Sequence, residues 1–240
     1  MTKKTLNQNA KYHQELINAI EPDFNFNNVP INRISASKNT SSIIFQNKIK
    51  KLEELKKKID SIENCNLKEN SKKIVFGNGN IDSPVMLIGE APGVEEEKSG
   101  LPFQGEIGEL LKKMLQAINI DIQKIYLTYS INFRTPKDRK PTTQEIKRYS
   151  KLLKEHMYII APRIIILMGS TAMESVTGIN NKISDERGKW KEIIFKNLSI
   201  PLMITFSPSY LIRFPENKKY SWEDLKKIRQ KIQDLDITIL

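Results

Sequence analysis

The sequence predicts an α/β protein with a three-layer α/β/α architecture around a central four-stranded parallel sheet. Short apolar runs alternate with longer segments of helical periodicity, and turn residues follow directly after the runs. Repeated strand–helix units imply a parallel sheet that helices cover on both faces. The predicted strands span residues 85–88, 124–128, 163–168 and 201–206.

The segments between the strands fit helices. Residues 105–118 place apolar side chains on one side, and a helix over 141–160 begins at either Thr142 or Thr143 as its cap. A short helix ends at Gly178, and residues 222–235 form a closing helix.

The first 45 residues are basic and rich in Asn and Ser, and we predict that they form an extension of the domain. Residues 25–28 and 35–42 have the composition of a linker or a disordered segment, and 12–20 fit a short helix. Residues 46–62 carry one apolar helical face. We therefore expect a helical or disordered extension over 1–45, followed by one domain over 46–240.

The formal net charge of +11 favours a polyanionic partner such as nucleic acid. An equally weighted alternative is compositional drift, because the chain is rich in Lys, Ile and Asn. No apolar run is long enough to cross a membrane, and the N-terminus lacks the pattern of a signal peptide.

The single cysteine, Cys65, excludes an intramolecular disulfide and fits a cytoplasmic location. The two histidines, His13 and His156, have no second ligand at a suitable spacing, so no metal site is expected.

Unusual clusters of residues follow the predicted strands. The first is the turn Gly89-Glu90-Ala91-Pro92-Gly93, which puts a carboxylate directly after a buried strand. In an open α/β sheet, ligands bind at the carboxyl ends of the strands. We therefore expect all the clusters to meet at one edge of the sheet. The others span 98–105, 129–139, 187–190 and 207–213.

This set of motifs resembles the family 4 uracil-DNA glycosylases and their relatives, from about Glu63 to Ile228. Five segments match in order and spacing: the GEAPG turn, G-x-P-F-x-G, R-x-P-x-x-R, an RGKW-like segment and x-P-x-Y-L-x-R. A closer match is the subgroup that keeps these motifs without a complete set of cluster cysteines. The resemblance implies a pocket for an extruded base and hydrolysis of its N-glycosidic bond.

The resemblance also implies roles for residues of the pocket. Glu90 is expected to position the attacking water and to stabilise the cationic sugar; the alternative is a carboxylate that caps a helix N-terminus. Phe103 is expected to stack on the base, or else to pack in the core beneath its loop. Gly89 and Ala91 are expected to line the base site beside Glu90.

The same resemblance assigns DNA contacts. Pro208, Tyr210 and Arg213 belong to the loop that enters DNA, where Tyr210 and Leu211 wedge into the base stack or Leu211 simply anchors the loop. The remaining candidate DNA contacts are Arg134, Arg187 and Lys189, and surface charge is the alternative for the last two.

Two pocket positions depart from the family pattern. Tyr129 stands where the family has an Asn that reads the uracil edge, and its single hydroxyl pairs with one base atom or its ring fills the pocket. Ser207 stands where the family has a His that donates to the base oxygen, so Ser207 is the candidate catalytic donor. Loss of one such donor costs about 10²- to 10³-fold in rate. We therefore predict slow, altered or lost activity.

The third departure concerns iron. Family 4 enzymes hold a [4Fe–4S] cluster with four cysteines. Here only Cys65 matches; Ile62 and Phe133 stand at two other positions, and the fourth falls near Arg148 or Tyr149. One thiolate cannot hold the cluster, so we expect no cofactor, apolar packing in the gap and a buried Cys65.

The leading prediction is a monomeric glycosylase of base-excision repair that acts on uracil in single- or double-stranded DNA. The alternative is a non-catalytic or weakly catalytic DNA-binding protein of the same fold. Glu90 and Phe103 favour the enzyme, whereas Tyr129 and Ser207 favour the alternative. Segments of phage-type DNA polymerases share these motifs, but the chain lacks the length of a polymerase.

Overall fold

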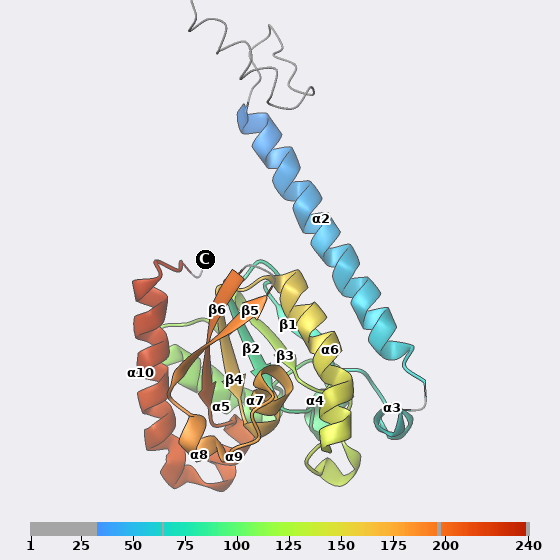
Figure 1. Ribbon diagram of the computed structural model, residues 1–240, viewed down its shortest axis with the longest axis vertical. Helices are drawn as coiled ribbons and strands as arrows, with labels where there is room; N and C mark the ends of the chain where they lie inside the picture. Colours follow the sequence, from blue (N-terminus) through green and yellow to red (C-terminus); the bar gives the residue numbers. More distant parts are fainter. Residues whose placement is uncertain (1–32, 64, 196–197, 239–240) are drawn as a thin grey trace, which may run out of the picture. The chain divides into compact units, whose positions relative to one another are not determined.

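The computed structural model describes residues 33–63, 65–195 and 198–238 (Figure 1). The chain divides into two compact units, residues 1–44 and residues 45–240. The short helix predicted over 12–20 and the linker at 25–28 lie outside the described residues. Within the described part of the chain, no helix is both long and apolar enough to cross a membrane.

A six-stranded sheet forms the centre of the larger unit, in the order β1-β3-β2-β4-β6-β5. The four predicted strands are β2, β3, β4 and β6, and they pair in parallel. The edge strands β1 and β5 pair antiparallel to their neighbours. The strands are β1 (Gly77–Gly79), β2 (Val85–Gly89), β3 (Tyr126–Tyr129), β4 (Ile164–Met168), β5 (Trp190–Phe195) and β6 (Leu198–Thr205).

Continuous apolar sequence explains the central strands. Every residue of β2 and β4 is buried, and Leu87 of β2 lies between Leu127 of β3 and Ile166 of β4. Strands buried on both faces need no alternation of polar and apolar residues. The predicted parallel sheet is therefore confirmed, with two antiparallel edges that the sequence did not predict.

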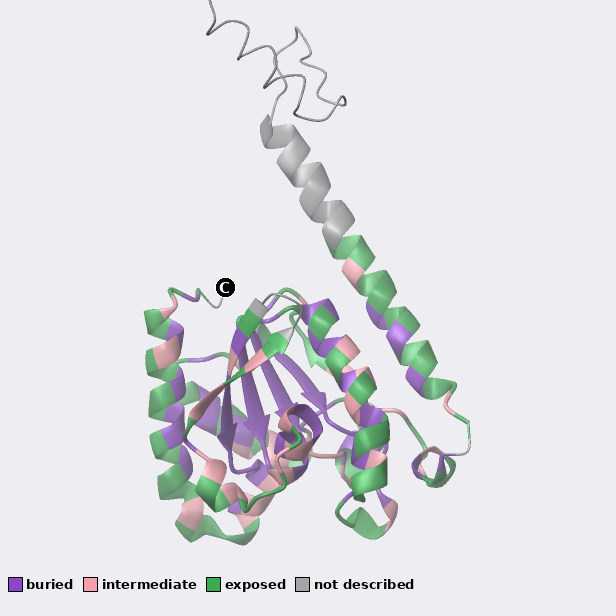
Figure 2. Cartoon of the chain, in the orientation of Figure 1, coloured by how far each residue is buried: buried purple, intermediate pink, exposed green. Residues whose placement is uncertain are grey.

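Helices cover both faces of the sheet, which confirms the three-layer architecture (Figures 1 and 2). One core contains residues of α2, α6 and α7, and the other contains residues of α5, α9 and α10. The helices are α2 (Arg33–Asp60), α3 (Asn66–Asn70), α4 (Val94–Ser99), α5 (Gly105–Gln116), α6 (Thr143–Ile160), α7 (Ser170–Thr177), α8 (Ile183–Glu186), α9 (Pro208–Arg213) and α10 (Lys218–Asp234). Short 3₁₀ helices span Ile122–Lys124, Pro136–Asp138 and Pro215–Asn217.

Two helix starts refine the sequence prediction. The linker expected over 35–42 is wrong, because α2 begins at Arg33. Extending a helix costs less than nucleating one, so a nucleated helix can continue into a segment of poor propensity. At α6, Thr142 is the cap: its hydroxyl accepts from the Glu145 N–H at 3.3 Å, and the Glu145 carboxylate accepts from the Thr142 N–H at 2.7 Å.

Candidate active site

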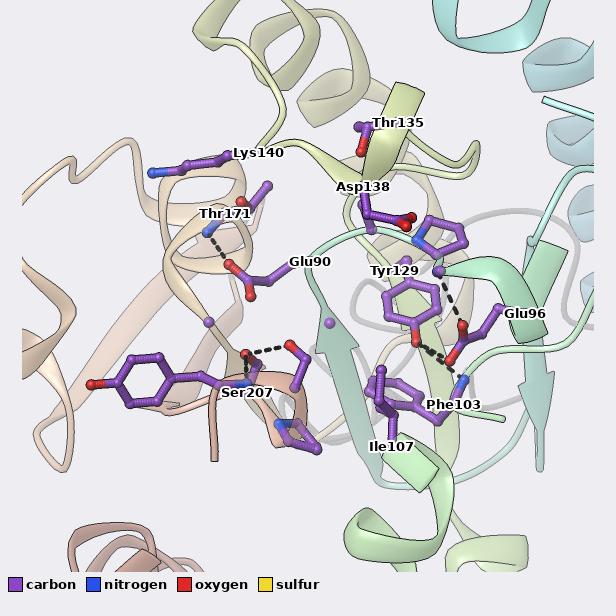
Figure 3. Close-up of a pocket in the computed structure, with 18 of the residues that line it drawn as sticks. Glu90, Glu96, Phe103, Ile107, Tyr129, Thr135, Asp138, Lys140, Thr171 and Ser207 are labelled. Atoms are coloured by element: carbon purple, nitrogen blue, oxygen red, sulfur yellow. Dashed lines mark hydrogen bonds between the residues drawn. The ribbon is translucent and has the colours of Figure 1, made fainter. Parts of the chain in front are cut away.

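A cavity of about 690 Å³ lies where β2, β3, β4 and β6 end (Figure 3). Each strand runs into a segment that lines this cavity, so residues far apart in sequence meet at one edge of the sheet. The structure brings nine of the predicted site residues together in the lining: Gly89, Glu90, Ala91, Phe103, Tyr129, Ser207, Pro208, Tyr210 and Arg213.

Glu90 is held by the start of helix α7. Its Oε1 accepts a hydrogen bond from the Thr171 N–H at 3.1 Å and one from the Ser170 hydroxyl at 3.4 Å. The positive end of the helix dipole lies beside the carboxylate, an arrangement that favours an anion. Glu90 therefore caps a helix and borders the cavity at once, so the two readings of this residue are compatible.

Gly169 makes room for this carboxylate. Its φ is +104°, a conformation that residues with a Cβ rarely adopt, and an added Cβ would collide with the carboxyl group of Glu90. The glycine after β4 therefore lets the Glu90 side chain reach the N-terminus of α7.

Tyr129 forms part of the cavity wall and is only 4% exposed. Its hydroxyl donates to Glu96 Oε1 at 3.1 Å and accepts from the Phe103 N–H at 3.2 Å (Figure 3). Burial, reinforced by the negative charge of Glu96, raises the pKa of Tyr129 well above its usual value. The phenol stays protonated and engaged within the protein, so the ring fills space at the position where the family has its Asn.

Glu96 organises this wall. Its side chain is buried and also accepts from the Gln104 N–H at 3.1 Å and the Gly93 N–H at 3.0 Å. Buried carboxylates need such donors, because an unpaired one carries a large desolvation cost. One carboxylate thus joins the turn after β2, the loop before α5 and the end of β3.

Phe103 packs against Tyr129, with ring centroids 4.7 Å apart and planes inclined by 32°. The residue is 5% exposed and has a φ of +54°, so its loop is tightly constrained. Phe103 belongs to the core and also lines the cavity. Phe103 and Tyr129 therefore form an aromatic wall of the cavity.

Ser207 is the N-cap of α9. Its Oγ accepts from the Tyr210 N–H at 3.3 Å and shares a hydrogen bond with the Ser209 hydroxyl at 3.1 Å. The Ser207 side chain is buried and bonded within its own helix. In this conformation the hydroxyl that we expected to donate to a base caps α9 instead.

The α9 loop is anchored by its apolar residues. Leu211 is 1% exposed, which favours the anchor over the wedge. The Tyr210 ring lies between Phe206 and Phe214, at centroid distances of 4.7 and 4.9 Å, and its hydroxyl accepts from Asn217 at 3.2 Å. Tyr210 is therefore fixed as well, whereas Phe214 exposes 44% of its surface.

The other predicted DNA contacts lie outside the cavity lining. Arg187 is half-buried, forms an ion pair with Asp224 and lies over the Tyr220 ring. Asp224 is fully buried, and burial raises its pKa against the opposing effect of Arg187. Lys189 is exposed beyond the lining.

Arg134 is likewise occupied by carboxylates. It donates to both oxygens of Asp138, at 2.7 and 2.8 Å, and to Glu97 at 3.3 Å. The hydrogen bond from Arg134 lowers the pKa of Asp138, so this pair stays ionised over a wide pH range. Arg134 therefore holds its loop to α4 rather than presenting a free charge.

The residues at the cluster positions do not fit an iron–sulfur cluster. The Cys65 thiol lies 3.3 Å from the Tyr149 hydroxyl, and the Phe133 ring meets Tyr149 edge-on at 6.4 Å. These side chains are buried, and Ile62 packs against the same core. In the described part of the chain, no three His, Cys, Asp or Glu side chains are arranged to hold a metal.

Three cavity residues escaped sequence reasoning. Glu96 had a signal, since it lies three residues after Gly93 at the start of a helix, where its carboxylate accepts from the Gly93 N–H. Thr171 had none, because it acts through its backbone N–H. Lys140 directly follows the 129–139 segment, and no signal in the sequence singled it out.

The fold and the cavity define an α/β protein with a cavity at the carboxyl edge of a parallel sheet, lined by the anchored carboxylates of Glu90 and Glu96. The family model of the uracil DNA glycosylase superfamily matches residues 76–229. The chain belongs to this superfamily.

Named relatives agree with this assignment. The chain is 34% identical to the Type-4 uracil-DNA glycosylase of Thermotoga maritima over 172 residues, 70% of this chain and 88% of that protein. It is 33% identical to the Type-4 uracil-DNA glycosylase of Sulfurisphaera tokodaii over 187 residues, 75% of this chain and 84% of that protein. A DNA polymerase of Bacillus phage SP01 is 28% identical over 161 residues, 67% of this chain but 17% of the polymerase.

Proposed function

We propose that this chain hydrolyses the N-glycosidic bond of uracil, or of a related damaged base, in DNA, at a lower rate than enzymes with the full family pocket. The observation that carries the proposal is the Glu90 carboxylate, fixed at the cavity by Thr171 and Ser170. The names of the relatives support the substrate class.

Glu90 has a direct role in the proposed reaction. Its Oε1 is engaged by α7, while Oε2 has no hydrogen bond to any described residue. That oxygen is available to accept from a water that attacks the sugar carbon. The same negative charge stabilises the oxocarbenium-like sugar as the base departs. Phe103 and Tyr129 supply a preformed aromatic wall for the extruded base.

Two features support a lowered rate. The departing base gains negative charge, and Ser207 is the position from which the family donates to it. Here its Oγ is engaged by Tyr210 and Ser209. The Tyr129 hydroxyl is bonded to Glu96 and to the Phe103 N–H. Tyr129 therefore cannot supply the paired donor and acceptor with which an Asn amide would bind the base edge. Weaker stabilisation of the leaving group lowers the rate by about 10²- to 10³-fold per lost donor.

The same two residues support the second candidate, a DNA-binding protein of this fold without useful catalysis. The two candidates make different predictions for one assay. Full-length protein is incubated with a single-stranded oligonucleotide that carries one uracil, and abasic sites are then cleaved with alkali. An oligonucleotide with thymine in place of uracil is the control, and a duplex version tests the strand preference.

The glycosylase predicts alkali-dependent cleavage at the uracil and nowhere else. Absence of cleavage at stoichiometric protein, with retained binding to the oligonucleotide, would reject the enzyme and leave the binding protein. We further propose that the reaction requires no iron and belongs to base-excision repair. Full activity of a metal-free preparation tests the first of these points.

A further inference from the structure

The charges around the cavity pose a problem for a DNA ligand. Five carboxylates and three cations line the cavity. The carboxylates are Glu90, Glu95, Glu96, Glu106 and Asp138, and the cations are Arg139, Lys140 and Arg213. A phosphodiester brought to such a lining is repelled unless a cation without a carboxylate partner lies near its path.

Most of the charged loop before α6 is already paired. Arg139 donates to both oxygens of Glu145, at 2.6 and 2.8 Å. Asp138 is bound by Arg134, as described above. These pairs neutralise the loop internally and hold its shape, but they leave neither arginine free for DNA.

Lys140 differs from its neighbours. It is exposed, it lines the cavity, and its amino group makes no hydrogen bond or ion pair with any described residue. In the view of Figure 3, Lys140 extends over the side of the cavity that holds Glu90 and Thr171. A free ammonium group therefore lies at the border of the same cavity that Glu90 lines.

The backbone of Lys140 is fixed although its side chain is free. Pro141 follows it and restricts its backbone to extended conformations. Its carbonyl accepts from Arg139 Nη1 at 3.1 Å, and the Arg139 carbonyl accepts from the Thr135 hydroxyl at 2.6 Å. The paired loop thus presents one cation without a carboxylate partner to the cavity. Arg213 of α9 also lines the cavity, but its Nε donates to the Ser209 carbonyl at 3.3 Å.

We propose that Lys140 binds a DNA phosphodiester next to the nucleotide that enters the cavity. This inference rests on the proposed function and adds a phosphate site to it. The ammonium group offsets part of the repulsion between that phosphate and the five carboxylates of the cavity lining, so the DNA backbone can approach the cavity.

The test measures binding without chemistry. The probe is a single-stranded oligonucleotide with one tetrahydrofuran abasic analogue, which has no N-glycosidic bond to cleave. Dissociation constants are measured over a range of salt concentrations for the wild type, Lys140→Gln and Lys137→Gln. Lys137 is the matched control, because it is an exposed lysine of the same loop that does not line the cavity.

Loss of one phosphate contact lowers the slope of log K against log salt by about 0.7 for single-stranded DNA. We expect this change for Lys140→Gln and no change for Lys137→Gln. A second series replaces single phosphates with neutral methylphosphonates. One replacement beside the abasic analogue should weaken binding by the wild type and leave binding by Lys140→Gln unaffected.

Equal slopes for the two variants, or independent effects of Lys140→Gln and of every methylphosphonate, would overturn the phosphate site. In that case uracil cleavage by the wild type would still stand, so the proposed function survives. Absence of salt-dependent binding by the wild type would also overturn the phosphate site, and the uracil cleavage assay would decide the proposed function separately.

Discussion

Tyr129 stands at one place where the chain departs from the family 4 pattern, and Tyr149 lies at or next to another, and the two side chains have different surroundings. Tyr149 lies among buried apolar side chains, with its hydroxyl against the Cys65 thiol. Tyr129 lies in a polar network with Glu96 and Phe103, at the wall of a cavity of about 690 Å³.

The difference shows that the two departures have separate consequences. Around Tyr149 the side chains of Cys65 and Phe133 are buried in the hydrophobic core, and the described residues there include no set of three metal ligands. Around Tyr129 the wall has changed while the cavity and the anchored Glu90 persist. Loss of the cluster residues therefore does not require loss of the reaction site.

The largest expected effect tests whether the retained side of the cavity is catalytic. Glu90→Gln preserves the size of the side chain and an oxygen that can accept from Thr171. It removes the charge that stabilises the sugar and orients the water, so we expect the single-turnover rate of uracil excision to fall by about 10²- to 10⁴-fold.

Glu109→Gln is the matched control, because Glu109 is an exposed carboxylate of α5 outside the cavity lining. A Glu90→Gln rate within tenfold of the wild type would contradict a catalytic role for the anchored carboxylate.

The second effect concerns the altered side of the cavity. Ser207→His supplies a donor where charge develops on the departing base, and we expect excision to accelerate by about 10²-fold. The substitution also removes the N-cap of α9, which costs about 0.5–2 kcal/mol of folding stability. Excision assays and urea denaturation measure the two effects independently.

Ser184→His, at an exposed position of α8 outside the cavity lining, controls for an added imidazole. An unchanged or lower rate for Ser207→His would show that Ser207 is not the vacant donor position.

The third prediction compares the two tyrosines directly by deleting each hydroxyl. Tyr129→Phe leaves the Phe103 N–H without its acceptor and removes a donor to the buried Glu96, so we expect a loss of about 1–3 kcal/mol in unfolding free energy. Tyr149→Phe removes only a contact with sulfur and should cost at most about 1 kcal/mol. Urea denaturation measures both losses. Equal losses of unfolding free energy for Tyr129→Phe and Tyr149→Phe would contradict the difference between the polar surroundings of Tyr129 and the apolar surroundings of Tyr149.

The smallest effect is expected at the thiol. Cys65→Ala removes a buried sulfur and should cost about 1 kcal/mol of stability. Uracil excision should stay within twofold of the wild type, and metal analysis of both proteins should find no stoichiometric iron. If the wild type contained iron, and both iron and activity were lost in Cys65→Ala, the conclusion that the residues around Cys65 do not hold a cluster would be contradicted.

Chain periodicity predicted the centre of the fold better than its borders. The apolar runs that became β2, β4 and β6 admit few other structures. The edge strand Gly77–Gly79 consists of Gly and Asn, which have low strand propensity, and pairs because β3 offers an open edge. Strand β5 was not predicted, because its first residue, Trp190, also belongs to the charged 187–190 segment.

The site shows the same division. Chain order was enough to gather Glu90, Tyr129 and Ser207 at one edge of the sheet, because parallel strands end together. The hydrogen-bond partners were not predictable in the same way. Asp224 lies in the middle of α10, and only the folded structure shows that it forms an ion pair with Arg187.

The bonds of Glu96 have a consequence for the dynamics of the cavity wall. The amides of Gly93 and Gln104 donate to this carboxylate, and the amide of Phe103 donates to the Tyr129 hydroxyl that is bound to it. None of the three can be released to solvent without disturbing one shared centre. These amides should therefore exchange with deuterium at a common rate, as one cooperative opening unit of the wall.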